Sequence, residues 1–390
     1  MTDTRSDFEI PEPAIRTWST FVPEETIKAV EQVLRSRWIN TGACEKALRE
    51  EIRRKFGAPY CVACSNGTAA LRVSYAAIGI KPGDEVVTTP YTFIATNTSI
   101  LEQGAAPVFA DIHYDSLNLD PESVRSKITA KTKAIVCVHY GGYACELDAL
   151  REVAREHGLP LVEDSAHALG SKYRGRYIGS DGDYVTFSLQ AVKIVTAGDG
   201  GIVCTSHPDA YDRLKKLVWY GVDREAKKTT ILDPLPEEIN QLGFKYNMND
   251  IIASIGLAGL QQIDRPLARR REIGLRYRDE LRSLRAITLL RFEDNRSPNF
   301  QIFPIHVQER ARFARFMRER GVMTLVNNRR NDRYKVFGAG VRDLPNTARA
   351  DQDTILIPIH ADLSDSDVST VIHAIHEYDR LVGGTDTGRR

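Results

Sequence analysis

Between residues 60 and 205 the sequence alternates short apolar runs with amphipathic stretches, and this alternation constrains the fold more than any other feature. Helices are predicted at about 68–79, 94–103, 121–127 and 146–157. Runs such as 134–138 (AIVCV) are apolar throughout, which is typical of strands buried on both faces. The pattern predicts an α/β fold with a mostly parallel central sheet flanked by helices, in which ligands bind at the carboxyl ends of the strands. The predicted strands are 60–64, 85–89, 106–110, 133–138, 159–163, 184–187 and 202–205.

Helical patterns flank this region on both sides. One helix opens at Pro23-Glu24-Glu25, and a second follows at about 45–56. A long helical pattern runs from about Asn249 to Leu284, with a bend expected near Pro266 because proline disrupts a helix interior. The pattern then changes to that of a smaller α+β domain, with strands at 287–291, 300–306, 322–326 and 354–357 and helices at 309–320 and 365–378.

A chain of 390 residues is too long to fold around one ordinary hydrophobic core, so two domains are predicted. Residues 1–250 are expected to form an N-terminal segment and the large α/β domain. Residues 251–380 are expected to form the long linking helix and the small C-terminal domain, and residues 381–390 a disordered tail.

The charge balance excludes some classes of partner. The 53 basic and 52 acidic residues give a net charge of +1, so no global field favours nucleic acid or an anionic membrane. No apolar run approaches the ~20 residues of a membrane helix. The polar N-terminus, MTDTRSDFEIPEPAI, lacks the apolar centre of a signal peptide.

The six cysteines are scattered along the chain, which indicates reduced thiols and predicts a cytoplasmic protein. Cys61 and Cys64 form a CxxC pair, but no second pair or histidine stands at zinc-finger spacing. We interpret both as strand residues and predict no metal site.

A possible phosphate cradle, Ser65-Asn66-Gly67-Thr68, lies between a predicted strand and the next helix. Glycine lets a backbone approach an anion, and a helix N-terminus offers free N–H groups. Considered alone, the same residues also fit a simple capping turn.

Two further features follow predicted strands. Asp164 ends the run 161–164 (LVED), where it can keep a heterocyclic nitrogen protonated or can serve as a structural acceptor. Tyr91 and Phe93 follow strand 85–89, and one of these rings can stack on a planar ligand, with core packing as the alternative.

The fourth feature is the stretch 187–201, FSLQAVKIVTAGDGG, in which Lys193 follows Ser188 by five residues. Apolar neighbours favour the neutral amine that a Schiff-base lysine needs, although a lone lysine here would more commonly be a surface residue. A phosphate cradle, an acid for a ring nitrogen, an aromatic ring and such a lysine are together the requirements of pyridoxal 5'-phosphate.

Five stretches in order resemble the DegT/DnrJ/StrS family, from about Pro11 to about residue 380. These fold-type-I pyridoxal-phosphate enzymes mostly aminate keto sugars attached to nucleotides. The stretches are SNGTAAL, PGDEVVTTPYTFIATNTSI, VEDSAHALGSKYRGRYIGSDGD, FSLQAVKIVTAGDGG and LGFKYNMNDIIASIGLAGLQ.

The resemblance implies that Lys193 binds the cofactor aldehyde, that Asp164 pairs with the pyridine nitrogen and that Phe93 stacks on the ring. It places His167 near the ring hydroxyl. Cofactor phosphate ligands are implied at Gly67, Thr68 and Ser188.

In the family a partner subunit completes the phosphate site from a GxNYR segment. This chain has Gly243-Phe244-Lys245-Tyr246-Asn247 there, so the asparagine is displaced by two positions, and we predict Asn247 as the cofactor ligand. Lys245 is a candidate substrate residue. The 328–333 stretch (NRRNDR) resembles an RND-type segment of some sugar aminotransferases, which makes Arg329 and Arg330 candidates for a diphosphate or a donor carboxylate, with a solvated charge run as the alternative. Arg224 is a weaker candidate.

The resemblance therefore predicts an aminotransferase that moves nitrogen from L-glutamate to a keto-deoxysugar linked to dTDP or another nucleotide. A homodimer with shared active sites is expected. Amination of a cyclitol ketone is the alternative. A further alternative is sugar dehydration, for which family members carry histidine in place of Lys193. The last alternative is a regulator that binds the cofactor without turnover.

Overall fold

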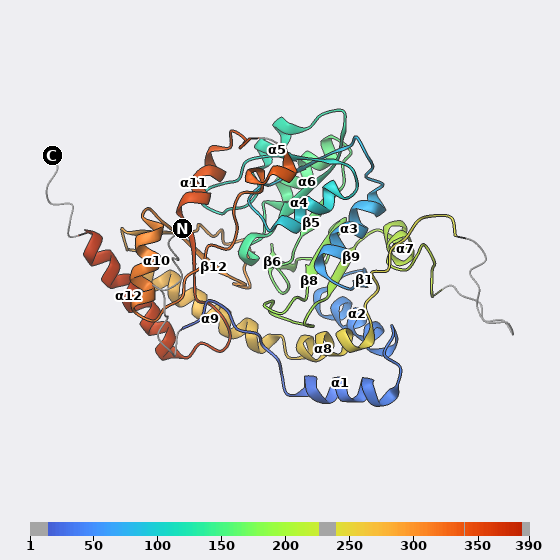
Figure 1. Cartoon of the computed structure of the whole chain (residues 1–390), viewed down its shortest axis with the longest axis horizontal. Coiled ribbons are helices and arrows are strands. Elements are labelled where there is room, and N and C mark those ends of the chain that lie inside the picture. The colour runs from blue at the N-terminus through green and yellow to red at the C-terminus, as the bar shows by residue number, and fades with distance from the viewer. Residues whose placement is uncertain (1–14, 226–238, 339, 384–390) are drawn as a thin grey trace, which may run out of the picture.

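A seven-stranded sheet forms the centre of the computed structural model, which describes residues 15–225, 239–338 and 340–383 (Figure 1). The strand order is β1-β9-β8-β5-β4-β2-β3. Strand β9 runs opposite to the other six strands, which confirms the mostly parallel sheet. The strands are β1 (Tyr60–Cys64), β2 (Glu85–Thr88), β3 (Ala106–Phe109), β4 (Thr132–Val138), β5 (Leu161–Asp164), β8 (Tyr184–Ser188) and β9 (Gly201–Thr205).

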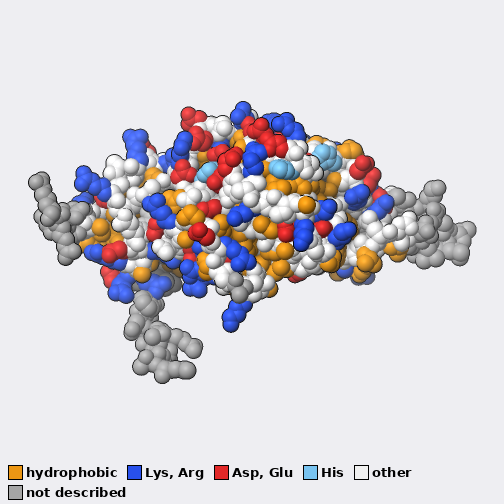
Figure 2. Space-filling view, turned by 90° about the horizontal axis from the view of Figure 1, so that it is seen from above, with side chains coloured by type: hydrophobic (Ala, Val, Ile, Leu, Met, Phe, Trp, Pro, Cys, Tyr) orange, Lys and Arg blue, Asp and Glu red, His pale blue; other side chains and the backbone are white. Residues whose placement is uncertain are grey.

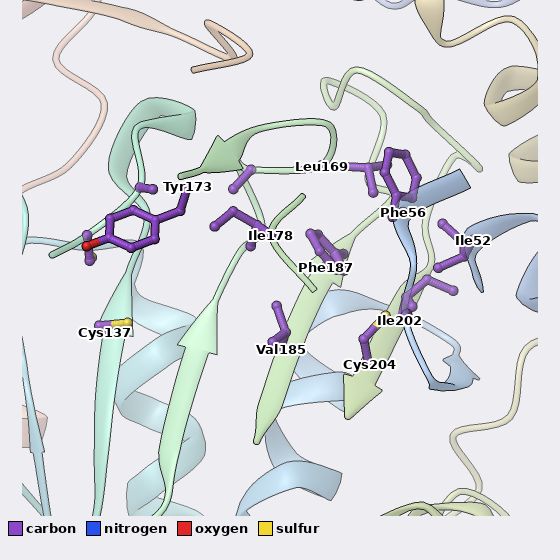
Figure 3. Packing of buried hydrophobic residues seen from close by; sticks show 14 of the residues in the cluster. Ile52, Phe56, Cys137, Leu169, Tyr173, Ile178, Val185, Phe187, Ile202 and Cys204 are labelled. Carbon is purple, nitrogen blue, oxygen red and sulfur yellow. The ribbon is translucent and has the colours of Figure 1, made fainter. Parts of the chain in front are cut away.

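Apolar side chains alternate between the two faces of this sheet, and each face is buried. Val185 and Phe187 of β8 lie on one side with Cys204 of β9 and Phe56 of α2 (Figure 3). On the opposite side Val203 packs in a second cluster with residues of α3 and α7. Burial on both faces explains the continuous apolar runs of the sequence. The helices that precede or cover the sheet are α1 (Glu25–Ser36), α2 (Ala43–Phe56), α3 (Gly67–Ile78), α4 (Ile94–Leu101), α5 (Pro121–Lys127), α6 (Leu147–Glu156), α7 (Pro208–Leu217) and α8 (Asp250–Gln261).

The C-terminal part, from residue 264 onwards, builds an antiparallel sheet in the order β10-β12-β13. Ile15 pairs with Val322, so the beginning of the described chain contacts this part. A small third sheet joins β11 to β6 and β7 in the order β11-β6-β7. The elements are β6 (Lys172–Tyr173), β7 (Arg176–Tyr177), β10 (Ile287–Leu289), β11 (Arg296–Ser297), β12 (Phe303–Val307), β13 (Thr354–Ile357), α9 (Asp264–Leu281), α10 (Arg310–Glu319), α11 (Pro345–Asp353) and α12 (Asp365–Gly383).

The structure differs from the sequence prediction at several points in this part. The predicted long helix is two helices, and Pro266 lies in the first turn of α9, where its missing N–H has no acceptor to lose. The predicted strand at 322–326 makes only isolated bridges, at Val322 and Leu325. Helix α12 continues to Gly383, while residues 384–390 of the predicted tail lie outside the described residues. The division into domains at residue 250 stays a prediction.

The surface carries both signs of charge. Lysine and arginine are interspersed with aspartate and glutamate over the face shown in Figure 2, as the near-zero net charge leads one to expect. In the part of the chain that the structure describes, we find no helix long and apolar enough to cross a membrane.

A buried carboxylate ties α8 to the start of α2. Asp250 accepts three backbone hydrogen bonds, from Gly42 (2.8 Å), Cys44 (3.1 Å) and Glu45 (3.0 Å). These N–H groups have no partner within the helix, so α2 depends on a residue about 200 positions further along the chain.

Replacing Asp250 with alanine should therefore lower the free energy of unfolding by about 3 kcal/mol, since buried N–H groups would lose a charged acceptor. Asp250→Asn keeps one acceptor oxygen and should lose about half as much. Thermal and urea unfolding of the three proteins test this. Equal stability of the alanine variant and the parent would contradict the assignment.

Candidate active site

A cavity of ≈ 620 Å³ opens at the carboxyl edge of the central sheet. Thr17 and Trp18 of the N-terminal segment line it together with residues of the sheet edge and the C-terminal part. Of the eight predicted cofactor residues, all except Asn247 line this cavity, namely Gly67, Thr68, Phe93, Asp164, His167, Ser188 and Lys193.

The turn before α3 and the end of β8 approach each other closely. Gly201 of β9 pairs with both Cys64 and Ser188, which brings the ends of β1 and β8 together. A Cβ on Gly201 would come within 2.2 Å of the Asn66 carbonyl oxygen, and one on Gly67 within 2.9 Å of the Ser188 Cβ. Only glycine fits at these two contacts.

The N-terminus of α3 faces the cavity at this point. Asn66 caps the helix, since its side chain accepts a hydrogen bond from Ala69 N (2.7 Å), so the capping interpretation is right for this residue. Gly67 and Thr68 begin the helix beside Ser188. A helix N-terminus next to a hydroxyl is a suitable site for a phosphate group.

Asp164 ends β5 and is only 6% exposed. Its carboxylate accepts hydrogen bonds from Thr96 Oγ1 (2.7 Å) and Ala166 N (3.1 Å). Burial raises the pKa of Asp164, while these two bonds and the charge of Lys193 act in the opposite direction. The bonds orient the carboxylate, as expected of an acid that must hold a ring nitrogen in one place.

Lys193 lies in the loop that follows β8. The loop is closed by hydrogen bonds between Leu189 and Gly200 (2.8 Å) and between Ala197 and Leu189 (2.8 Å). Burial lowers the pKa of Lys193 to about 8, although the charge of Asp164 acts to raise it. A substantial fraction of this amine is therefore neutral near pH 8, as a nucleophile or proton carrier requires.

His167 lines the cavity next to Lys193. Its pKa is well below the usual value because desolvation disfavours the charged ring, and the charge of Lys193 lowers it further. Among the described residues its Nδ1 has no hydrogen-bond partner. A neutral ring with an unpartnered nitrogen can bond a hydroxyl group of a ligand.

The structure distinguishes the two aromatic residues that follow β2. Tyr91 is 2% exposed and packs against Tyr140, so it belongs to the core. Phe93 is 65% exposed and lines the cavity. Of the two rings, Phe93 is the one available to a planar ligand.

Lys245 and Asn247 do not line the cavity of their own chain. Lys245 Nζ donates to Asn247 Oδ1 (2.6 Å) and lies 4.0 Å from the centre of the Trp219 ring. Arg224 lies on the same ring at 4.6 Å. Asn247 in turn donates to Thr41 Oγ1 (2.7 Å).

The two predicted arginines of the 328–333 stretch have different environments. Arg330 is 2% exposed and binds Asp332 through two hydrogen bonds of 2.7 Å. This geometry gives it a structural role and removes it from the cavity. Arg329 is exposed and follows Asn328, which lines the cavity.

Several residues of the site were not found by sequence reasoning. Thr96, which orients Asp164, lies within the motif 82–100, but no signal separates it from its neighbours. Tyr140 lines the cavity and packs against the Tyr91 ring. Gln301 comes from a stretch for which the sequence predicts only a strand.

The residues present fit pyridoxal 5'-phosphate. The helix N-terminus with Ser188 suits the phosphate group, and Asp164 suits the ring nitrogen. The unpartnered His167 Nδ1 suits the ring hydroxyl, and Lys193 suits the aldehyde. The fold and this cavity define a pyridoxal-phosphate enzyme of fold type I.

Comparison with known proteins identifies the family. The model of the DegT/DnrJ/EryC1/StrS aminotransferase family matches residues 22–376, and the chain belongs to this family. Membership of this family implies that the cofactor is pyridoxal phosphate. SpsC, a spore coat polysaccharide biosynthesis protein of Bacillus subtilis strain 168, is 33% identical over 384 residues, which cover 94% of this chain and 96% of SpsC.

Two solved structures are similar over nearly the whole chain. The sugar aminotransferase CalS13 from Micromonospora echinospora gives a TM-score of 0.88 at 32% identity, covering 93% of this chain and 99% of CalS13. Spr1654 from Streptococcus pneumoniae, in its PLP form, gives 0.87 at 28% identity, covering 95% and 99% of the two chains.

Asp164→Asn should lower the pKa of Lys193 below its value of about 8, because the variant removes the negative charge that opposes the effect of burial. The pH dependence of Lys193 modification by an amine reagent measures this in the cofactor-free chain, with peptide mass spectrometry as the readout. Asp183→Asn is a control, since Asp183 bonds Leu161 N and His207 instead. A midpoint that stays or rises in the Asp164 variant would show that the two groups do not interact.

Proposed function

We propose that this chain is a pyridoxal-phosphate aminotransferase that transfers the amino group of L-glutamate to the keto group of a nucleotide-linked deoxysugar, carried by dTDP or another nucleotide. The observation that carries the proposal is the convergence of Asp164 and Lys193 in one cavity with the phosphate cradle and Phe93. Because the residue at 193 is lysine, we favour amino transfer over sugar dehydration. The five buried and one half-buried free cysteines support a cytoplasmic location.

Each side chain has a distinct task in this reaction. When bound, pyridoxal phosphate supplies an aldehyde that takes up the amino group and a ring that accepts electrons as the substrate Cα–H bond breaks. Asp164 keeps the ring nitrogen protonated, and Thr96 keeps Asp164 in place. The neutral amine of Lys193 would take the proton from the substrate Cα and deliver it to the cofactor carbon that carries the aldehyde. Phe93 covers one face of the ring.

Amide side chains support a sugar as the acceptor. Gln190, Asn327 and Asn328 line the cavity, and amides both donate and accept hydrogen bonds, as sugar hydroxyls require. The relatives CalS13, a sugar aminotransferase, and SpsC, a polysaccharide biosynthesis protein, support the same class of substrate. Exposed Arg329, next to Asn328, is the cation we propose for the diphosphate.

We also propose a homodimer in which Asn247, with Lys245 beside it, completes the cofactor phosphate site of the partner subunit. Both residues lie outside the cavity of their own chain, at a surface that also exposes Tyr220. Trp38 and Ile39, in the loop before α2, are also exposed there, and Thr41 of this loop bonds Asn247. Exposed apolar residues next to polar ones are typical of a protein interface.

The amino-donor claim is tested by colour. The purified protein loaded with pyridoxal phosphate should show a visible band from the cofactor bound to Lys193, and L-glutamate should abolish it by converting the cofactor to its amino form. Borohydride reduction before the donor is added, followed by peptide mapping, should place the cofactor on Lys193. A band that persists with every amino donor, or a label on another lysine, would refute the proposal.

The acceptor is identified with the same amino-form protein. A nucleotide-linked keto sugar should restore the band, whereas a cyclitol ketone without a nucleotide should not. Restoration of the band by the cyclitol alone would select the alternative acceptor.

Asp164→Ala should retain cofactor binding to Lys193 and lose at least about a hundredfold in turnover, since the ring nitrogen would no longer be held protonated.

A shared site predicts complementation between two inactive variants. Lys193→Ala lacks the catalytic amine and Asn247→Ala lacks the residue given to the partner. Dissociation and mixing of the two should produce dimers that contain one intact site. Activity should rise to about a quarter of that of the parent, because about half of the dimers are mixed and each has one good site of two. No recovery in mixtures shown to contain mixed dimers would place Asn247 in its own site or in none.

A further inference from the structure

The side chain of Gln301 bridges the backbone on both sides of Lys193. Its Oε1 accepts a hydrogen bond from Ile194 N (3.1 Å), and its Nε2 donates to Val192 O (2.9 Å). Gln301 is 6% exposed and lines the cavity. One amide from the C-terminal part thus binds the two residues that flank the lysine in sequence.

Gln301 is itself held in place by two neighbours. Its backbone N–H donates to Asn299 Oδ1 (2.9 Å). Arg270 Nη1 donates to Gln301 O, Phe300 O and Ile359 O, each at 3.0 Å. Burial lowers the pKa of Arg270 to about 10, so the guanidinium still carries its charge at neutral pH. These contacts fix the backbone of Gln301 independently of the bonds that its side chain makes to the lysine loop.

Phe300 adopts a left-handed conformation between these two amides, with φ of 52°. This region is unfavourable for a bulky residue and persists only where the surroundings enforce it. The Phe300 ring packs on Gly274 of α9, where a Cβ would come within 2.6 Å of a ring atom. The strained turn places Asn299 and Gln301 against two different segments of the active site.

Asn299 binds the segment that carries His167. Its Nδ2 donates to His167 O (2.8 Å) and to Leu169 O (2.9 Å). A Cβ on Gly142 would come within 1.8 Å of Asn299 Oδ1, so a glycine is required beside this amide. The turn 299–301 therefore connects the His167 segment to the Lys193 loop.

We propose that Gln301 is a positioning residue for Lys193, and that the turn 299–301 sets the lysine against the His167 segment. The role in catalysis rests on the proposed function, whereas the two hydrogen bonds to the loop do not. A catalytic group must be held to within about half an ångström, and a loop is held less precisely than a helix or a strand. Gln301 supplies the loop with a tertiary support that its own sequence lacks.

The support from Gln301 also affects the protonation of the Lys193 amine. Lys193 is half-buried beside Asp164 and His167, and partial desolvation is the main cause of its depressed pKa. A loosened loop would expose the amine further to water. The protonated form would then be favoured more, because desolvation would no longer disfavour the charge.

Gln301→Met tests the proposal because methionine preserves the volume and removes both hydrogen bonds. In the cofactor-free chain, hydrogen–deuterium exchange of the peptide that contains Ile194 should become about tenfold faster. The pH midpoint for modification of Lys193 should move upward. In the loaded enzyme, kcat should fall by about tenfold or more while KM for glutamate changes less than about threefold.

Ile305→Val is the matched control, since it removes one methylene from β12 in the same part of the chain without touching the lysine loop. It should lower the thermal midpoint and leave both readouts of Lys193 unchanged. If Gln301→Met does not fold, Gln301→Glu retains the acceptor for Ile194 and loses the donor to Val192. The lysine loop of this folded Gln301→Glu variant should then exchange faster than that of the parent.

Unchanged exchange and an unchanged Lys193 midpoint in a folded Gln301 variant would overturn the proposal. Because both readouts use the cofactor-free chain, they test the positioning role even if the aminotransferase function fails. Conversely, faster exchange in a protein whose cofactor band never responds to an amino donor would overturn the catalytic role and leave only a structural support.

Discussion

The parallel pairing of β5 with β8 is the constraint on which the candidate active site depends. Asp164 lies opposite Thr186 in this register, two residues before Ser188 ends β8 and the loop of Lys193 begins. Because the two strands run in the same direction, their carboxyl ends meet at one edge of the sheet. A shift by one residue would turn Asp164 to the other face, away from Thr96, and would separate the acid from the lysine.

Desolvation shifts the pKa of both groups of the Asp164–Lys193 pair. Desolvation raises the pKa of Asp164 and lowers that of Lys193, while the attraction between the two opposes both shifts. Thr96 and Ala166 hold the carboxylate, and Gln301 holds the loop of the amine. The two candidate catalytic groups follow strands of the central sheet, and part of their orientation comes from the C-terminal part of the chain.

The sequence predicts features that depend on a pattern within one segment, and it misses features that depend on distant residues. All seven strands of the central sheet were predicted to within about two residues, because strands buried on both faces need continuous apolar runs. The strands β6, β7 and β11 have two residues each, which is too short for any periodicity to develop. The left-handed turn at Phe300 was read as part of a strand, since nothing local marks a conformation that Gly274 and Arg270 enforce from a distance.

The sequence by itself determined the class of chemistry, because the glycine turn, the acid and the lysine each follow a recognisable strand and together match one cofactor. Through the family resemblance, the lysine at 193 also predicted amino transfer rather than sugar dehydration. Only the tertiary structure decided that Phe93 and not Tyr91 faces the cavity, that Arg330 is bound to Asp332, and that Gln301 supports the lysine loop. Gln301 and Ile194 are 107 positions apart, and although Arg330 and Asp332 are close in sequence, their burial depends on the folded chain around them. No local pattern encodes which of two similar side chains the folded chain will bury.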